Sequence, residues 1–141
     1  MTAPKIRVSA ATFSSPDAHA LGAFYAELLG WTVVEDYGGW VRVRPPSGGM
    51  GLSFHHEDHY ERPVWPTAPG EQLMMVHLDI GVDDLDAGVA WAISLGATVS
   101  EHQPQPHARV MLDPDGHPFC LFAGGPRSEF DTADWHGVER S

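Results

Sequence analysis

The sequence predicts an α+β protein with two βαβββ modules packed side by side as one cupped mixed sheet. Residues 74–99 form strand, helix and strand, because the apolar spacing changes from every second residue to every third or fourth. The same pattern occurs 66 residues earlier, the distance from Gly30 to Gly96. Each module's sheet has one apolar face that must be covered. We therefore expect helices on one side of the paired modules and a concave face on the other.

Residues 74–99 contain the clearest single unit of this pattern. Apolar side chains alternate with other side chains from Met74 to Ile80, which predicts a half-buried strand. After two aspartates the apolar residues take helical spacing, and Gly96 is suited to end the helix. A further strand is predicted at residues 97–99.

The first module is predicted to have the same order of elements. A strand at residues 5–13 runs into a turn, where Ser15 or Asp17 is suited to cap the following helix. That helix has apolar residues on one face and ends at Gly30. Three more strands, separated by turns rich in glycine and proline, are predicted at residues 31–34, 40–44 and 50–55.

A stretch rich in proline, charged and aromatic residues, 57–72, separates the modules. Module one then spans about residues 5–56, and module two spans residues 73–124. We expect one domain over residues 1–125 and a polar C-terminal tail at 126–141. The last two strands of module two are predicted at residues 108–112 and 118–123.

The composition restricts the kinds of partner. The formal net charge is −11, with 8 lysines and arginines that form no cluster, which argues against a nucleic-acid partner. A single cysteine excludes an internal disulfide and suits a reducing, cytoplasmic location. No apolar run reaches membrane-spanning length, so we expect no membrane partner.

Three motifs resemble the vicinal oxygen chelate superfamily, which contains glyoxalase I, extradiol dioxygenases and bleomycin-resistance proteins. They are FYAELLGW in the first module, HLDIGVDDLDAGVAWAISLGATV at the start of the second and DPDGHPFCLF at its end. The resemblance is closest to the glyoxalase-like branch and covers about residues 5–124. It implies the cupped fold of two βαβββ modules, and it specifies no activity.

The resemblance also implies where a metal would bind. In metal-using relatives, the first and last strands of each module supply His, Gln or Glu ligands to a divalent cation. In the second module these positions are His77 and Cys120, the latter where relatives tend to have a glutamate. The repeat places their first-module counterparts at Ala11, which cannot bind a metal, and at Leu52 or Ser53. One clear ligand remains, with a thiol as a second candidate.

Three roles for His77 follow. It is a hydrogen-bonded strand histidine, a polar contact or acid–base group in a metal-free pocket, or a metal ligand. A pair of His77 and Cys120 suits zinc better than magnesium or manganese and needs a third ligand. Cys120 alone is equally explained as a small apolar residue. We therefore expect no obligate cofactor, with a divalent metal (zinc, iron, manganese or nickel) as the alternative.

Further histidines offer weaker candidates. His55 and His59 have a spacing of i and i+4, but they form no HExxH motif and prolines follow, so a loop is the simpler interpretation. If His55 stays in strand register, it joins His77 at the mouth of the cavity and is a second possible metal ligand. His117 occupies a turn position that relatives often fill with asparagine, and we interpret it as part of the turn.

Aromatic residues provide the material for an organic-ligand site. Each one alone is explained by the core, but together with small residues they suggest an apolar cavity with few polar groups. The strand faces shared with Ala11 and Cys120 place two of them where ligands bind in this fold. The candidates are Phe13, Trp40, Phe54, Trp65 and Phe122.

The leading hypothesis is a small-molecule-binding protein of the glyoxalase/bleomycin-resistance type. It holds an apolar or aromatic organic compound in the cupped sheet, with His77 as a polar contact and without an obligate metal. The alternative is an isomerase, lyase or dioxygenase that uses a metal or His77 as general base, so enzyme activity stays open. A regulatory partner domain is a third possibility. We expect a homodimer, because cupped sheets leave edges to cover and the superfamily commonly pairs.

Overall fold

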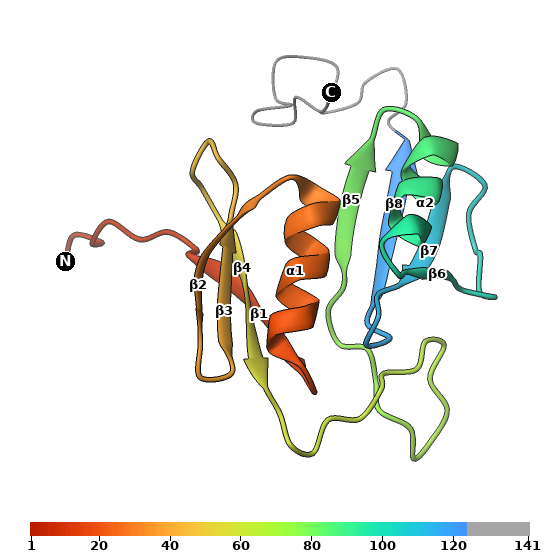
Figure 1. The fold of residues 1–141 in the computed structure, drawn as a ribbon, viewed down its shortest axis with the longest axis horizontal. Helices are drawn as coiled ribbons and strands as arrows, with labels where there is room; N and C mark the ends of the chain where they lie inside the picture. The colour runs from red at the N-terminus through yellow and green to blue at the C-terminus, as the bar shows by residue number, and fades with distance from the viewer. Residues whose placement is uncertain (124–141) are drawn as a thin grey trace.

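Each module of the computed structural model is a four-stranded mixed sheet with one helix (Figure 1). The structure describes residues 1–123, so the predicted tail at 126–141 lies outside the described residues. The α+β fold with two βαβββ modules is confirmed. Module one contains β1 (Ala10–Ser15), α1 (Ala18–Leu29), β2 (Thr32–Tyr37), β3 (Trp40–Arg44) and β4 (Gly51–His56). Module two contains β5 (Leu78–Val82), α2 (Leu85–Ser94), β6 (Thr98–Val99), β7 (Ala108–Leu112) and β8 (Pro118–Ala123).

The two sheets have the same strand order. They run β1-β4-β3-β2 and β5-β8-β7-β6, and the first strand of each module is parallel to the last. The first and last strands of a module are therefore neighbours. This places β1 and β5 at the ends of their sheets, and it brings the positions expected to hold ligands next to each other.

Local chemistry sets the start of both helices and the end of α1. The Asp17 carboxylate accepts the backbone N–H of Ala20 at the start of α1, and Asp84 caps α2 in the same way. Of the two caps predicted for α1, Asp17 is therefore the one used. Gly30 ends α1 with φ of 69°, a left-handed conformation that glycine adopts without steric cost.

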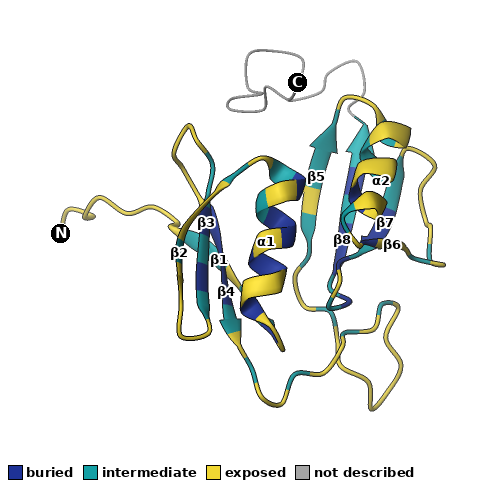
Figure 2. Ribbon diagram, viewed as in Figure 1, coloured by how far each residue is buried: buried dark blue, intermediate teal, exposed yellow. Residues whose placement is uncertain are grey.

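Helix α1 connects the modules because its apolar face packs against both. Tyr25 stacks on Phe54 of its own sheet with ring centroids 5.5 Å apart, and Phe24 meets Phe119 of the second sheet at 6.3 Å. Figure 2 shows the buried residues of α1 on one side of the helix and exposed residues on the other. The core is thus shared between the modules. Among the described residues, no helix is long and apolar enough to cross a membrane.

Two strands are shorter than predicted at their N-terminal ends. β1 begins at Ala10 and β5 at Leu78, because their ladder partners begin at Gly51 and Phe119. A strand without a neighbour leaves its backbone groups unpaired, so alternation alone does not extend it. Ser9 still accepts the backbone N–H of Gly51, and the residues before it extend away from module one (Figure 1).

Candidate functional site

Three potential metal ligands gather on the face of the second sheet that is opposite the core. His77 Nε2 lies 3.0 Å from Asp79 Oδ1, and the donor atoms of His77, Asp79 and Cys120 all lie within 4.8 Å of one another. Strand geometry explains the grouping. Asp79 on β5 is paired in register with Cys120 on β8, and His77 lies two residues before Asp79, on the same face.

These residues form part of the wall of a cavity of about 530 Å³, called here the sheet-face cavity. The Trp65 ring, from the linker, stacks on His77 with centroids 5.2 Å apart. Apolar side chains supply most of the other strand positions. The lining consists of Trp65, His77, Asp79, Pro104, Gln105, His107, Ala108, Val110, Cys120 and Phe122.

The thiol of Cys120 is held in its protonated form. Burial raises the pKa of Cys120, and the charge of Asp79 and a hydrogen bond from the thiol to that carboxylate raise it further. The neutral thiol is a weak nucleophile and a poor metal ligand until it loses its proton. The Asp79 carboxylate accepts a hydrogen bond from the Cys120 thiol and also pairs with His77, so it links the other two side chains.

The first module has hydroxyl groups at the positions equivalent to Asp79 and Cys120. The N-cap of α1, Asp17, lies 67 residues before the N-cap of α2, Asp84. In the strand pair β1 and β4, Thr12 lies opposite Ser53, just as Asp79 lies opposite Cys120 in β5 and β8. The repeat in this region is therefore 67 residues, one more than the sequence comparison predicted.

This slip of one residue changes the face to which a strand residue belongs. The counterpart of His77 becomes Ala10 instead of Ala11, and neither side chain can bind a metal. The predicted counterpart of Cys120, Ser53, agrees with the register.

The slip also explains where the first-module aromatic residues lie. Phe13 packs at 5.6 Å from both Tyr25 and Phe54, on the side of the sheet that faces α1. Phe54, which we expected at a ligand site, is 0% exposed in the core and lines neither cavity described here. Phe13 lies at the edge of the core and lines a different cavity, described below.

Two further candidates also lie apart from His77. Trp40 donates its indole N–H to Glu35 at 3.0 Å on the first sheet, and it lines neither cavity described here. His55 contacts Ser14 at 3.0 Å, on the strand pair β1 and β4. Within residues 1–123 it belongs to no cluster with His77. Of the predicted residues, only His77, Cys120, Phe122 and Trp65 come together in the sheet-face cavity.

Asp79 is the site residue that sequence reasoning missed as a ligand. The signal was present, because the strand alternation already put Asp79 on the same face as His77. Gln105 and His107 were not predictable in this way, since they reach the cavity from an irregular loop.

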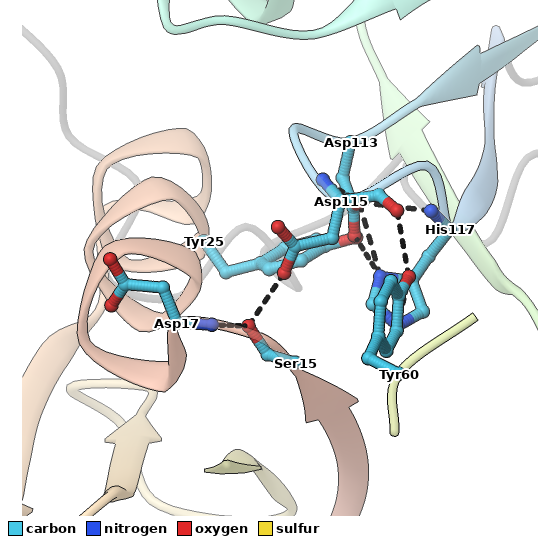
Figure 3. A network of polar contacts seen from close by, with 7 residues as sticks. All are labelled: Ser15, Asp17, Tyr25, Tyr60, Asp113, Asp115 and His117. Atoms are coloured by element: carbon cyan, nitrogen blue, oxygen red, sulfur yellow. Dashed lines mark hydrogen bonds and ion pairs between the residues drawn. The ribbon is translucent and has the colours of Figure 1, made fainter. Parts of the chain in front are cut away.

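A second group of polar residues lies where the two modules meet (Figure 3). Asp113 is 1% exposed and accepts hydrogen bonds from the Tyr25 hydroxyl at 2.8 Å and from the backbone N–H groups of Asp115 and His117. His117 Nδ1 lies 2.8 Å from the same carboxylate. We call Ser15, Asp17, Tyr25, Tyr60, Asp113, Asp115 and His117 the junction network.

The junction network joins module one, the linker and module two. Ser15 donates to the Asp115 carboxylate at 2.6 Å, and the Tyr60 hydroxyl donates to the Asp115 carbonyl at 2.7 Å. Burial, aided by the charge of Asp113, raises the pKa of Tyr25 and Tyr60. Burial also raises the pKa of Asp115, although the hydrogen bond from Ser15 opposes this shift. These groups therefore hold the junction together with neutral tyrosines.

Comparison with known proteins identifies the family. The model of a family described as a glyoxalase-like domain matches residues 10–122. No curated protein sequence matches the chain.

Solved structures show the same fold. A glyoxalase/bleomycin resistance protein/dioxygenase family enzyme from Burkholderia phytofirmans PsJN has a TM-score of 0.64 and 17% identity, covering 84% of this chain and 98% of that one. TnmS3, an antibiotic binding protein from Streptomyces sp. CB03234, has a TM-score of 0.59 and 21% identity, with coverages of 88% and 100%. A glyoxalase-related enzyme from Fulvimarina pelagi has a TM-score of 0.62 and 18% identity, with coverages of 84% and 88%.

Proposed function

This chain belongs to the glyoxalase-like domain family of the vicinal oxygen chelate superfamily, and from that premise we propose that it binds a small organic molecule. The proposed ligand is apolar or aromatic and lies in the sheet-face cavity, without an obligate metal. The observation that carries the proposal is the cavity itself. Half of its ten lining residues are aromatic or aliphatic, and the polar groups of His77, Asp79 and Cys120 converge among them, a combination suited to an organic ligand.

The walls of the cavity indicate how such a ligand is held. Trp65 and Phe122 supply ring surfaces from the linker and β8, and His77 supplies a polar contact between them. TnmS3, which shares the fold, is an antibiotic binding protein, so the fold serves this kind of task in another chain. Sequestration of an antibiotic-like compound is one version of the proposal.

The chemistry of Cys120 supports independence from a metal. Where metal-using relatives tend to have a glutamate, by the resemblance described above, this chain has a thiol whose pKa is raised. A metal has to displace the proton and compete with the existing contacts of Asp79. An organic ligand needs neither change.

The test is a titration followed by heteronuclear NMR, with 2-naphthol as a neutral aromatic probe. We expect shifts at Val110, Cys120 and Phe122. Trp65→Ala is expected to weaken binding about two- to tenfold, the usual contribution of an aromatic contact. Trp40→Ala is the matched control, because that half-buried tryptophan lies outside the cavity. Equal losses in both variants, or no binding, would contradict the proposal.

A second candidate function is metal-assisted or acid–base catalysis, favoured by the cluster of His77, Asp79 and Cys120. The three donors fit a zinc-type site that keeps an open position for substrate or water. A bound metal would supply Lewis acidity there. Without it, Asp79 orients the His77 ring as a general base.

Elemental analysis separates the two functions. It should use untagged protein never exposed to chelator. We expect far less than about one metal ion per chain, the content of a filled site. Nearly full occupancy in the wild type, lost in His77→Ala, would support the second candidate instead.

The homodimer and a cytoplasmic location stay part of the proposal. The end strands β1 and β5 are preceded by exposed apolar residues, among them Ile6 at 82%, Val8 at 68% and Val76 at 83%. A second copy would cover them. The free thiol of Cys120 suits a reducing compartment. Light scattering at micromolar concentration tests the dimer, and a monomer would contradict it.

A further inference from the structure

A second cavity, of about 600 Å³, lies at the junction of the modules and is called here the junction cavity. It is bounded by β1, by both ends of the linker and by the turn that contains His117. It shares no lining residue with the sheet-face cavity. Any ligand in it is therefore held by a different set of groups.

The His117 ring is held in a defined orientation in the wall of this cavity. Its Nδ1 lies 2.8 Å from the buried carboxylate of Asp113, so the N–H of the neutral ring is at Nδ1 and the lone pair is at Nε2. The Tyr60 oxygen is 3.4 Å from Nε2, but its O–H donates to the Asp115 carbonyl at 2.7 Å. Nε2 is thus a hydrogen-bond acceptor available to a ligand.

Aromatic contacts fix the same ring from two sides. Phe13 meets His117 edge-on at 5.3 Å between centroids, and Tyr60 contacts it at 5.5 Å. Rotation of the ring would break these contacts as well as the bond to Asp113. An acceptor fixed in advance binds a donor at lower entropic cost.

The charges that line the junction cavity are of one sign. Glu57 and Glu61 are in the lining, which contains no lysine or arginine, and the nearby positive charge of Arg62, which acts on Tyr60, comes from outside the lining. The remaining walls are largely apolar and include Phe13, Met74 and Val76. Anionic ligands are therefore disfavoured, whereas a cation attached to an apolar body is complementary to both parts of the wall.

We propose that the junction cavity binds small organic ammonium compounds. The ammonium group donates to Nε2 of His117 in the field of Glu57 and Glu61, and the apolar body lies against Phe13 and the linker. This site is separate from the sheet-face cavity and does not depend on the function proposed for it.

The test compares three probes of similar shape by heteronuclear NMR: 1-naphthylmethylamine, 1-naphthylmethanol and 1-naphthoate. We expect the amine to shift resonances of Phe13, Tyr60 and Val76. It should bind about two- to fivefold more tightly than the alcohol, as partly exposed charge pairs allow. The carboxylate should bind most weakly.

Two sets of variants test the residues. The double variant Glu57→Gln with Glu61→Gln should weaken binding of the amine about two- to fivefold and leave binding of the alcohol unchanged. The matched control, Asp83→Asn with Glu101→Gln, removes two exposed charges outside the cavity and should change neither. His117→Asn keeps a turn-forming residue at this position. It should weaken binding of both the amine and the alcohol by about two- to tenfold.

Three results would overturn the inference. They are shifts confined to residues such as Val110 and Cys120, binding of the carboxylate equal to that of the amine, and equal effects of the two double variants. The first of these would still support the proposed sheet-face site, so the two proposals fail separately.

Discussion

Of the aspartate–histidine pairs within residues 1–123, two that lie at the two sites have nearly the same length but different surroundings. His117 Nδ1 lies 2.8 Å from Asp113, and His77 Nε2 lies 3.0 Å from Asp79. The side chains of the first pair are 17% and 0% exposed, whereas those of the second are 28% and 64% exposed. The first pair lies in the junction network and the second on the wall of the sheet-face cavity.

The difference shows that burial, more than residue type, decides what such a pair does. A buried carboxylate must have its hydrogen bonds made by the protein, so Asp113 has several donors and is part of the structure. A partly exposed carboxylate exchanges its partner for water or a ligand at little cost. Asp79 is therefore the carboxylate that is free to serve a binding site.

The largest expected effect on stability comes from removing Asp113, the carboxylate of the buried pair. Asp113→Ala removes the acceptor of the Tyr25 hydroxyl, two backbone N–H groups and His117. We expect it to lower the free energy of unfolding by about 3–5 kcal/mol, as the loss of a buried, multiply bonded charge does. Asp79→Ala should lower the free energy of unfolding by less than about 1 kcal/mol. Urea unfolding measures both, and similar losses would contradict the assignment of roles.

The next effect isolates one bond of the junction network. Tyr25→Phe removes the hydroxyl that donates to Asp113 and keeps the aromatic ring in the core. We expect a loss of about 1.5–3 kcal/mol, the usual contribution of a hydrogen bond to a charged group. Tyr60→Phe is the matched control, since its hydroxyl donates to a neutral carbonyl and should cost about 0.5–1.5 kcal/mol. A larger loss for Tyr60→Phe would show that the carboxylate is not the centre of the network.

Zinc titration tests the more exposed pair, His77 and Asp79, together with Cys120. Because the pKa of Cys120 is raised, a zinc ion bound through the thiolate must release its proton. The apparent affinity should then rise with pH, by at most about tenfold per pH unit. Cys120→Ser should remove most of this pH dependence. Calorimetry in buffers of different ionisation enthalpy measures the protons released, and release that is unchanged in Cys120→Ser would argue against Cys120 as a ligand.

The smallest effect concerns Asp115. Burial raises the pKa of Asp115 above its ordinary value of 3.8, so its charged form destabilises the folded state at pH 7. Asp115→Asn keeps an acceptor for Ser15 and should stabilise the protein by less than about 1 kcal/mol, because solvent screens this partly exposed group. The gain should disappear as the pH falls through the raised pKa towards 3.8, where the wild type is protonated. A gain that is constant with pH would contradict this explanation.

Much of the fold follows from local signals. The strands at Trp40–Arg44, Ala108–Leu112 and Pro118–Ala123 match their predicted bounds, because glycine and proline turns delimit them. The cap at Asp17 and the end at Gly30 follow from their own side chains and backbone. The starts of β1 and β5 did not follow, since they depend on where the neighbouring strand begins.

For the site, the sequence by itself determined the module repeat, the alternation that puts His77 and Asp79 on one face, and the cysteine opposite them. Only the tertiary structure decided the register of 67 residues, which turns Phe13 and Phe54 towards α1. It also decided that Tyr25, Asp113 and His117 meet in one network, although Tyr25 and Asp113 are far apart in the chain. Periodicity reports which face a residue shares with its sequence neighbours, whereas burial and partner choice depend on what the other module places against that face.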